Sequence, residues 1–133
     1  MPLFRSRGPS GRSSPLEREL NRVIAYGQFQ LDPQSVDPAS FGNLEADLYP
    51  LAISDPAAFM QDLTGLVLPA GGLATYGGAR LAGSLLGWEF KDAHYLSMLD
   101  AALEWRRAEG TGAAWLAPYE LQRWEQLHGV GSW

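Results

Sequence analysis

The polar side chains best placed to recognise a small ligand lie in the most apolar stretch of the chain, residues 63–90. Tyr76 and Arg80 are four residues apart there, so on a helix they share one face. A phenol beside a guanidinium could bind a carboxylate or another small ligand. Alternatively, Tyr76 packs and Arg80 reaches an acid elsewhere, because a buried arginine must be paired. We favour the second interpretation, and keep Tyr76 and Arg80 as the candidate ligand-binding residues.

The glycines of this stretch do not form a known phosphate-binding pattern. A Walker loop requires G-x-x-x-x-G-K-[ST], because backbone amides cradle the phosphate and the lysine neutralises it. Residues 72–80 contain no lysine, and no G-x-G-x-x-G register fits them. Close approach of a neighbouring helix explains the glycines better.

Patterns for catalysis or metal binding are sparse. The chain has no cysteine and only two histidines, His94 and His128. Glu125 and His128 have the Glu-x-x-His spacing of carboxylate di-metal sites, but such sites need a second copy and further glutamates. No G-x-S-x-G nucleophile motif is present either. We therefore expect no catalytic residue, no metal and no cofactor.

Charge is distributed unevenly along the 133 residues. Arg5, Arg7 and Arg12 lie in an acid-free start, whereas residues 15–133 carry fifteen acids against seven bases. Residues 1–13 contain little to bury, so we expect a disordered basic tail followed by a single helical domain over 14–133. The acidic body disfavours nucleic acid and favours a basic partner.

The spacing of apolar residues and helix caps predicts an all-α fold, a compact bundle of five or six non-parallel helices. Predicted helices cover about 14–27, 37–49, 55–68, 73–86, 92–109 and 118–128, with breaks at Gly27 and at Tyr49-Pro50. Small residues at four-residue spacing (Ala74, Gly78 and Ala82) make the 73–86 helix the expected centre. The alternative is an α+β fold with a small hairpin drawn from residues 28–31 and 48–53.

A membrane-spanning helix is not expected. Residues 63–79 are uncharged, but Pro69 and the adjoining glycines interrupt them before the roughly twenty continuous apolar residues that a span requires. Without a secretory signal or cysteine, we expect a cytoplasmic protein.

The function that these features favour is a non-enzymatic protein-binding module, for example a small acidic inhibitor or immunity-type protein that binds a basic protein. Carboxylates and large apolar side chains are the candidate partner-binding residues, because acids complement a basic partner and tryptophan is a frequent interface anchor. They are Asp47, Asp55, Asp62, Met98, Trp105 and Trp115. A small-ligand-binding protein or enzyme using Tyr76 and Arg80, a structural subunit of an assembly, and a homo-oligomer remain open.

Overall fold

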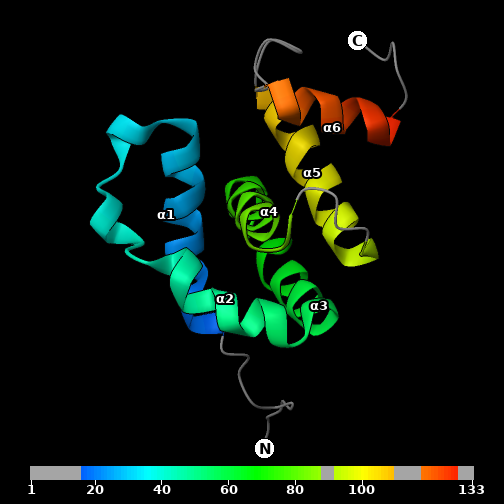
Figure 1. Ribbon diagram of the computed structural model, residues 1–133. Helices are drawn as coiled ribbons and strands as arrows, with labels where there is room; N and C mark the ends of the chain where they lie inside the picture. Colours follow the sequence, from blue (N-terminus) through cyan, green and yellow to red (C-terminus); the bar gives the residue numbers. More distant parts are fainter. Residues whose placement is uncertain (1–15, 88–91, 110–117, 129–133) are drawn as a thin grey trace, which may run out of the picture.

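The protein is a bundle of α-helices (Figure 1). The computed structural model describes residues 16–87, 92–109 and 118–128, and within these ranges it contains no strand. The helices are α1 (Leu20–Leu31), α2 (Leu44–Ser54), α3 (Pro56–Val67), α4 (Gly72–Leu86), α5 (Ala93–Glu109) and α6 (Pro118–His128). Single 3₁₀ turns lie at Glu17–Glu19 (η2), Pro33–Ser35 (η3) and Pro38–Ser40 (η4). The predicted all-α bundle is confirmed, and the α+β alternative is wrong because residues 28–31 and 48–53 are helical. The predicted tail, residues 1–13, lies outside the described residues.

Helix α4 lies at the centre of the bundle, with α1 on one side and α5 on the other (Figure 1). Its residues 74–79 and 81–83 are all buried. Small residues permit this position because they let neighbouring backbones come close. A Cβ on Gly77 would lie 2.3 Å from the carbonyl oxygen of Val23, and one on Gly27 would lie 2.8 Å from Cα of Gly77. The two helices therefore cross with their backbones in contact at Gly27 and Gly77.

The predicted end of the first helix at Gly27 is wrong. Helix α1 continues to Leu31, through residues 28–31 that the α+β alternative places in a hairpin. Gly27 is buried at the crossing with α4, so its role is close packing. The last turn is held by tertiary contacts, because Phe29 packs against Phe41 with ring centroids 5.2 Å apart.

The second predicted helix is displaced along the chain. Asp37 and Pro38 open only the 3₁₀ turn η4, and Gly42, with φ of 55°, separates that turn from α2. Helix α2 then passes through Pro50, where the sequence predicts an end. Leu48 and Ala52 are buried on either side of Pro50, and their packing keeps the chain helical. Pro50 itself is exposed, so the backbone carbonyl that loses its partner can face water.

Side-chain caps set the starts of α3 and α5 as the sequence predicts. Asp55 accepts a hydrogen bond from the amide of Ala58 at 3.2 Å, and Pro56 occupies the first turn of α3. Asp92 accepts from the amides of His94 and Tyr95 at 2.8 and 3.1 Å. Both helices therefore begin where a carboxylate satisfies the free amides of the first turn.

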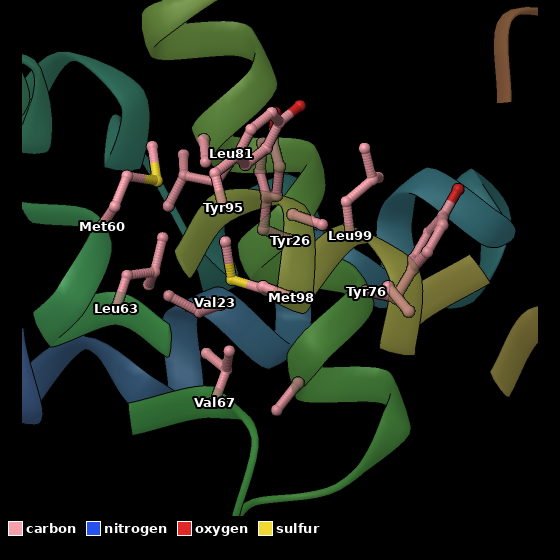
Figure 2. Packing of buried hydrophobic residues seen from close by; sticks show 14 of the residues in the cluster. Val23, Tyr26, Met60, Leu63, Val67, Tyr76, Leu81, Tyr95, Met98 and Leu99 are labelled. Carbon is pink, nitrogen blue, oxygen red and sulfur yellow. The ribbon is translucent and has the colours of Figure 1, made fainter. Parts of the chain in front are cut away.

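The hydrophobic core forms where α1, α3 and α5 converge on α4 (Figure 2). Gly78 of α4 lies against this cluster, since a Cβ there would approach Val67 at 3.1 Å and Met98 at 3.2 Å. The glycine thus lets α3 and α5 close on one face of α4 while Gly77 admits α1 on another. The largest fully buried apolar side chains are Tyr76, Tyr95, Leu16, Leu44, Met60, Leu63, Leu81, Met98 and Leu103, with Val23 and Val67.

Two glycine substitutions of opposite effect test this packing. Gly77→Ala should destabilise the protein by about 2–3 kcal/mol, because the new methyl group overlaps the backbone of α1. Gly65→Ala should stabilise it by up to about 1 kcal/mol, since nothing lies within 4 Å of the new Cβ and alanine is the better helix former. Urea unfolding of both variants beside wild type gives the two values. Equal effects of the same sign would show that α1 and α4 do not meet in this way.

Candidate functional site

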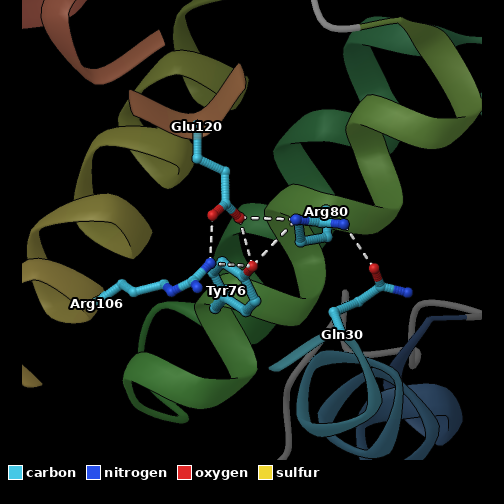
Figure 3. A network of polar contacts seen from close by, with 5 residues as sticks. All are labelled: Gln30, Tyr76, Arg80, Arg106 and Glu120. Atoms are coloured by element: carbon cyan, nitrogen blue, oxygen red, sulfur yellow. Dashed lines mark hydrogen bonds and ion pairs between the residues drawn. The ribbon is translucent and has the colours of Figure 1, made fainter. Parts of the chain in front are cut away.

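The predicted pair Tyr76 and Arg80 lies at the centre of a polar network formed by four helices (Figure 3). Both residues come from α4, and their hydrogen bond measures 3.1 Å from Nη1 of Arg80 to the tyrosine oxygen. Gln30 joins from the last turn of α1, Arg106 from α5 and Glu120 from the first turn of α6. The network therefore connects segments that are far apart in the chain.

Glu120 is the common acceptor of this network. Its carboxylate accepts hydrogen bonds from the Tyr76 hydroxyl and from Nη1 of Arg106, and it accepts from Nη1 of Arg80 at 2.7 Å. The Tyr76 oxygen also accepts from Arg106 at 2.7 Å. The second terminal nitrogen of Arg80 donates to the side-chain oxygen of Gln30 at 2.6 Å. These contacts pair the Tyr76 hydroxyl and three terminal guanidinium nitrogens with acceptors, whereas the buried Nε of Arg106 has no hydrogen-bond partner among the described residues.

Burial makes these contacts strong and makes them depend on one another. The side chain of Glu120 is 3% exposed, against 19% for Arg80 and 16% for Arg106. Both guanidinium groups also lie over the Tyr76 ring, at 5.7 Å for Arg80 and 5.3 Å for Arg106. A cation near the face of an aromatic ring is attracted by the negative charge of that face. Two positive charges therefore share one carboxylate and one aromatic ring.

The cavity that the described residues enclose beside the network is too small for a ligand larger than one water molecule. The cavity at Tyr76, Arg80, Glu120 and Arg123 has a volume of about 10 Å³, whereas about 10–15 Å³ is needed for a single water. Arg80 reaches an acid, Glu120, and Tyr76 is 1% exposed. This geometry fits the packing interpretation of the pair, in which the network attaches α6 to α4 and α5.

Burial also raises the pKa of Tyr76. Loss of water around the hydroxyl is the largest cause, and the Glu120 carboxylate raises the pKa further, while Arg80 and Arg106 oppose the change. Tyr26 shows the same direction for related reasons, namely burial and a hydrogen bond to Glu45. Both hydroxyls therefore keep their protons in the folded state at pH values where a free tyrosine ionises.

The predicted partner-binding acids lie on α2 and α3. Asp47 is 54% exposed and pairs with Arg22 at 2.8 Å. Asp55 is exposed and caps α3, while Asp62 is exposed on the outer side of that helix. The structure thus places Asp55 and Asp62 on one helix, at its start and in its middle.

The predicted partner-binding apolar residues lie elsewhere, and one of them is a core residue. Met98 is fully buried in contact distance of α4, so a partner cannot reach it without opening the core. Trp105 is half-buried, and its ring lies over Gly72, whose added Cβ would come within 2.1 Å of the ring. Both side chains therefore pack against α4, Met98 at Gly78 and Trp105 at Gly72. Trp115 lies outside the described residues.

The structure offers no metal centre or membrane span in its described part. Residues 16–87, 92–109 and 118–128 contain no group of three or more potential metal ligands. Over the same residues, no helix combines the length and the hydrophobicity needed to cross a bilayer. His94 is exposed at the start of α5.

Two surface features were missed by the sequence reasoning. The first is the outer side of α2, where Tyr49 is 48% exposed and Ile53 is 52% exposed. The second is a hollow of about 570 Å³ beside α3. A signal for the first was present, since α2 carries apolar residues on opposite sides, with Leu44, Leu48 and Ala52 on one and Tyr49 and Ile53 on the other, which is unusual for a helix at the surface.

Comparison with known proteins gives no match: neither a family model, nor a curated protein, nor a solved structure is significantly similar to this chain.

Replacing Glu120 tests whether the network is structural. Glu120→Gln should lower the free energy of unfolding by about 2–3 kcal/mol, because two largely buried arginines lose their anion. Tyr76→Phe should cost about 1–2 kcal/mol, since the hydroxyl alone is lost. Chemical denaturation measures both. Glu125→Gln, on the same helix but partly exposed, is the matched control and should change stability by less than about 0.5 kcal/mol.

The tyrosine pKa values predict a loss of stability in alkali. A pKa raised in the folded state means that stability is complete below the ordinary tyrosine value of 10.0 and falls as the pH rises above it. Each of Tyr26 and Tyr76 should contribute a slope of about 1.4 kcal/mol per pH unit there. The free energy of unfolding, measured with urea from pH 9 to pH 11.5 across the ordinary tyrosine pKa of 10.0, should fall less steeply with pH for Tyr76→Phe than for wild type. Equal slopes for the two proteins would contradict a raised pKa of Tyr76 in the folded state.

Proposed function

We propose that this protein is a non-enzymatic binding module that recognises a basic protein partner through the outer face of α2. One observation carries the proposal: α2 lies at the surface of the bundle, yet its outward side is apolar. That side, named here the α2 face, consists of Ala46, Tyr49, Pro50 and Ile53, all exposed.

The spacing of the α2 face is that of a helix contact surface. Residues 46, 49, 50 and 53 recur at intervals of three, one and three, so they form a continuous stripe along the helix. Leu44, Leu48 and Ala52 occupy the opposite side and are buried in the core. A helix that is apolar on both sides is normally covered on both sides. Exposed apolar patches of this kind mark interaction sites in soluble proteins.

Charge around the α2 face indicates the kind of partner. Helices α2 and α3 carry Glu45, Asp47, Asp55 and Asp62, and residues 23–79 contain no lysine or arginine. Arg22 pairs with Asp47, whereas the exposed Glu45 and Asp55, near the two ends of α2, receive no lysine or arginine from residues 23–79. A second copy of the chain would bring acid against acid, whereas a partner with an apolar ridge flanked by lysine or arginine would complement both features. An inhibitor or immunity-type protein that masks a basic effector is one form of this function.

The test uses the α2 face directly. A photoreactive benzoylphenylalanine at position 49 should crosslink to one partner protein in cells of the source organism, while the same residue at exposed position 39 should not. With the purified partner, Tyr49→Ser/Ile53→Ser should weaken binding at least about 30-fold, the effect of losing a tyrosine hot spot. Added salt should weaken binding by wild type as well, because exposed charges are screened.

Controls separate the proposal from its alternatives. Leu68→Ser removes a comparably exposed side chain (39%) outside α2 and should leave affinity unchanged. The double variant should keep the stability of wild type within about 0.5 kcal/mol, as expected for surface substitutions. Light scattering should show a monomer. A dimer that Tyr49→Ser/Ile53→Ser dissolves would assign the face to self-association and overturn the proposal.

A further inference from the structure

A groove along the outer side of α3 is formed by two adjoining hollows. The larger, of about 570 Å³, lies toward the end of α3, and the smaller, of about 120 Å³, lies between α2 and α3. Asp62 lines both of them. We name the two together the α3 groove. It is separate from the α2 face and from the polar network.

The walls of the α3 groove combine carboxylates with apolar side chains. Glu17 and Asp62 line the larger hollow, and Asp55 and Asp62 line the smaller one. The remaining lining of the larger hollow is mixed, with the polar Gln61, Thr64 and His94 beside the apolar Leu66, Leu68 and Pro69. Gly65 adds open space, since a Cβ placed there would meet nothing within 4 Å. Such a surface complements a segment that carries both guanidinium groups and apolar side chains.

We propose that the α3 groove binds the basic segment of residues 1–13 of this same chain. That segment contains Arg5, Arg7 and Arg12 and no acid, and it includes the apolar pair Leu3-Phe4. Its positive charge is therefore opposite to that of the groove carboxylates. Like the groove, it combines charged groups with apolar side chains. Arginine suits this role because its planar guanidinium forms paired hydrogen bonds with carboxylates.

The point of attachment favours binding within one molecule. Leu16 lines the smaller hollow and Glu17 lines the larger, so the segment joins the described chain at the groove itself. Helix α3, with 12 residues, is about 18 Å long. An extended chain covers about 3.3 Å per residue, so even Arg12 can reach the acids nearby and Arg5 can reach the far end.

Tethering makes a weak contact sufficient. A segment attached through a short linker experiences an effective concentration in the millimolar range. A dissociation constant of about 0.1 mM would therefore give nearly complete occupancy of the groove, although the same peptide added separately would bind poorly. The proposal requires no other protein and is tested on this chain alone, so its failure can be told apart from failure of the α2-face proposal, although Asp55 and Asp62 enter both arguments.

The full-length chain allows a direct test, because it contains no cysteine. A nitroxide spin label on Ser10→Cys should broaden the backbone amide signals of α3, those of Asp62 and Gly65 above all, and spare those of α6. Replacing Arg5, Arg7 and Arg12 together by glutamine should abolish the broadening. Asp62→Asn should reduce it, whereas Glu109→Gln, an exposed carboxylate on α5, should not.

A second measurement uses the vacant groove. In the unlabelled triple-arginine variant, a synthetic peptide of residues 1–13 should shift the same α3 amides at millimolar concentration, and a peptide with glutamine in place of arginine should not. The variants should keep the dispersed amide spectrum of the folded protein, because Asp62 and Glu109 are exposed and glutamine replaces each arginine with another long polar side chain. Broadening that spreads evenly over the surface, concentrates on another helix, or survives the arginine replacements would overturn the proposal.

Discussion

The backbone contact between α1 and α4 is the constraint on which the rest of the structure depends. At Gly27 and Gly77 there is no space for a side chain, since a Cβ on Gly77 would lie 2.3 Å from a carbonyl oxygen of α1. This close approach brings the last turn of α1 beside α4, so that Gln30 reaches Arg80. It also leaves the other faces of α4 free for α3 and α5, which contact it at Gly78. Helix α4 can occupy the centre because it carries glycine, which has no side chain, where neighbouring helices contact it.

The polar network neutralises the two arginine charges that the packing of α4 and α5 largely buries. Arg80 and Arg106 point into a region where water is scarce, and an unpaired buried charge is strongly destabilising. Glu120 supplies the compensating charge from α6, and the Tyr76 hydroxyl completes the hydrogen bonding as both donor and acceptor. The same groups would be attractive in an active site. Here they bond mainly to one another, and the cavity beside Tyr76, Arg80 and Glu120 is about 10 Å³.

The distribution of polar and apolar side chains separates internal packing from external recognition. The residues that resemble a ligand site, Tyr76 and Arg80, are engaged inside the bundle. Tyr49 and Ile53, by contrast, are exposed on α2. The stretch around them, residues 23–79, contains carboxylates but no lysine or arginine. A surface of this kind is suited to a protein that carries apolar and basic groups, which is why the functional proposals concern binding rather than chemistry.

What the sequence determined by itself was local. The capping carboxylates Asp55 and Asp92 set the starts of α3 and α5, and the four-residue spacing of Tyr76 and Arg80 placed them on one face of α4, because these effects involve neighbours along the chain. Tertiary structure decided the rest. It carried α1 beyond Gly27 and α2 through Pro50, it chose Glu120, 40 residues from Arg80, as the acid, and it left one apolar side of α2 uncovered. Packing between distant segments overrides a glycine or proline signal and selects partners that no local pattern specifies.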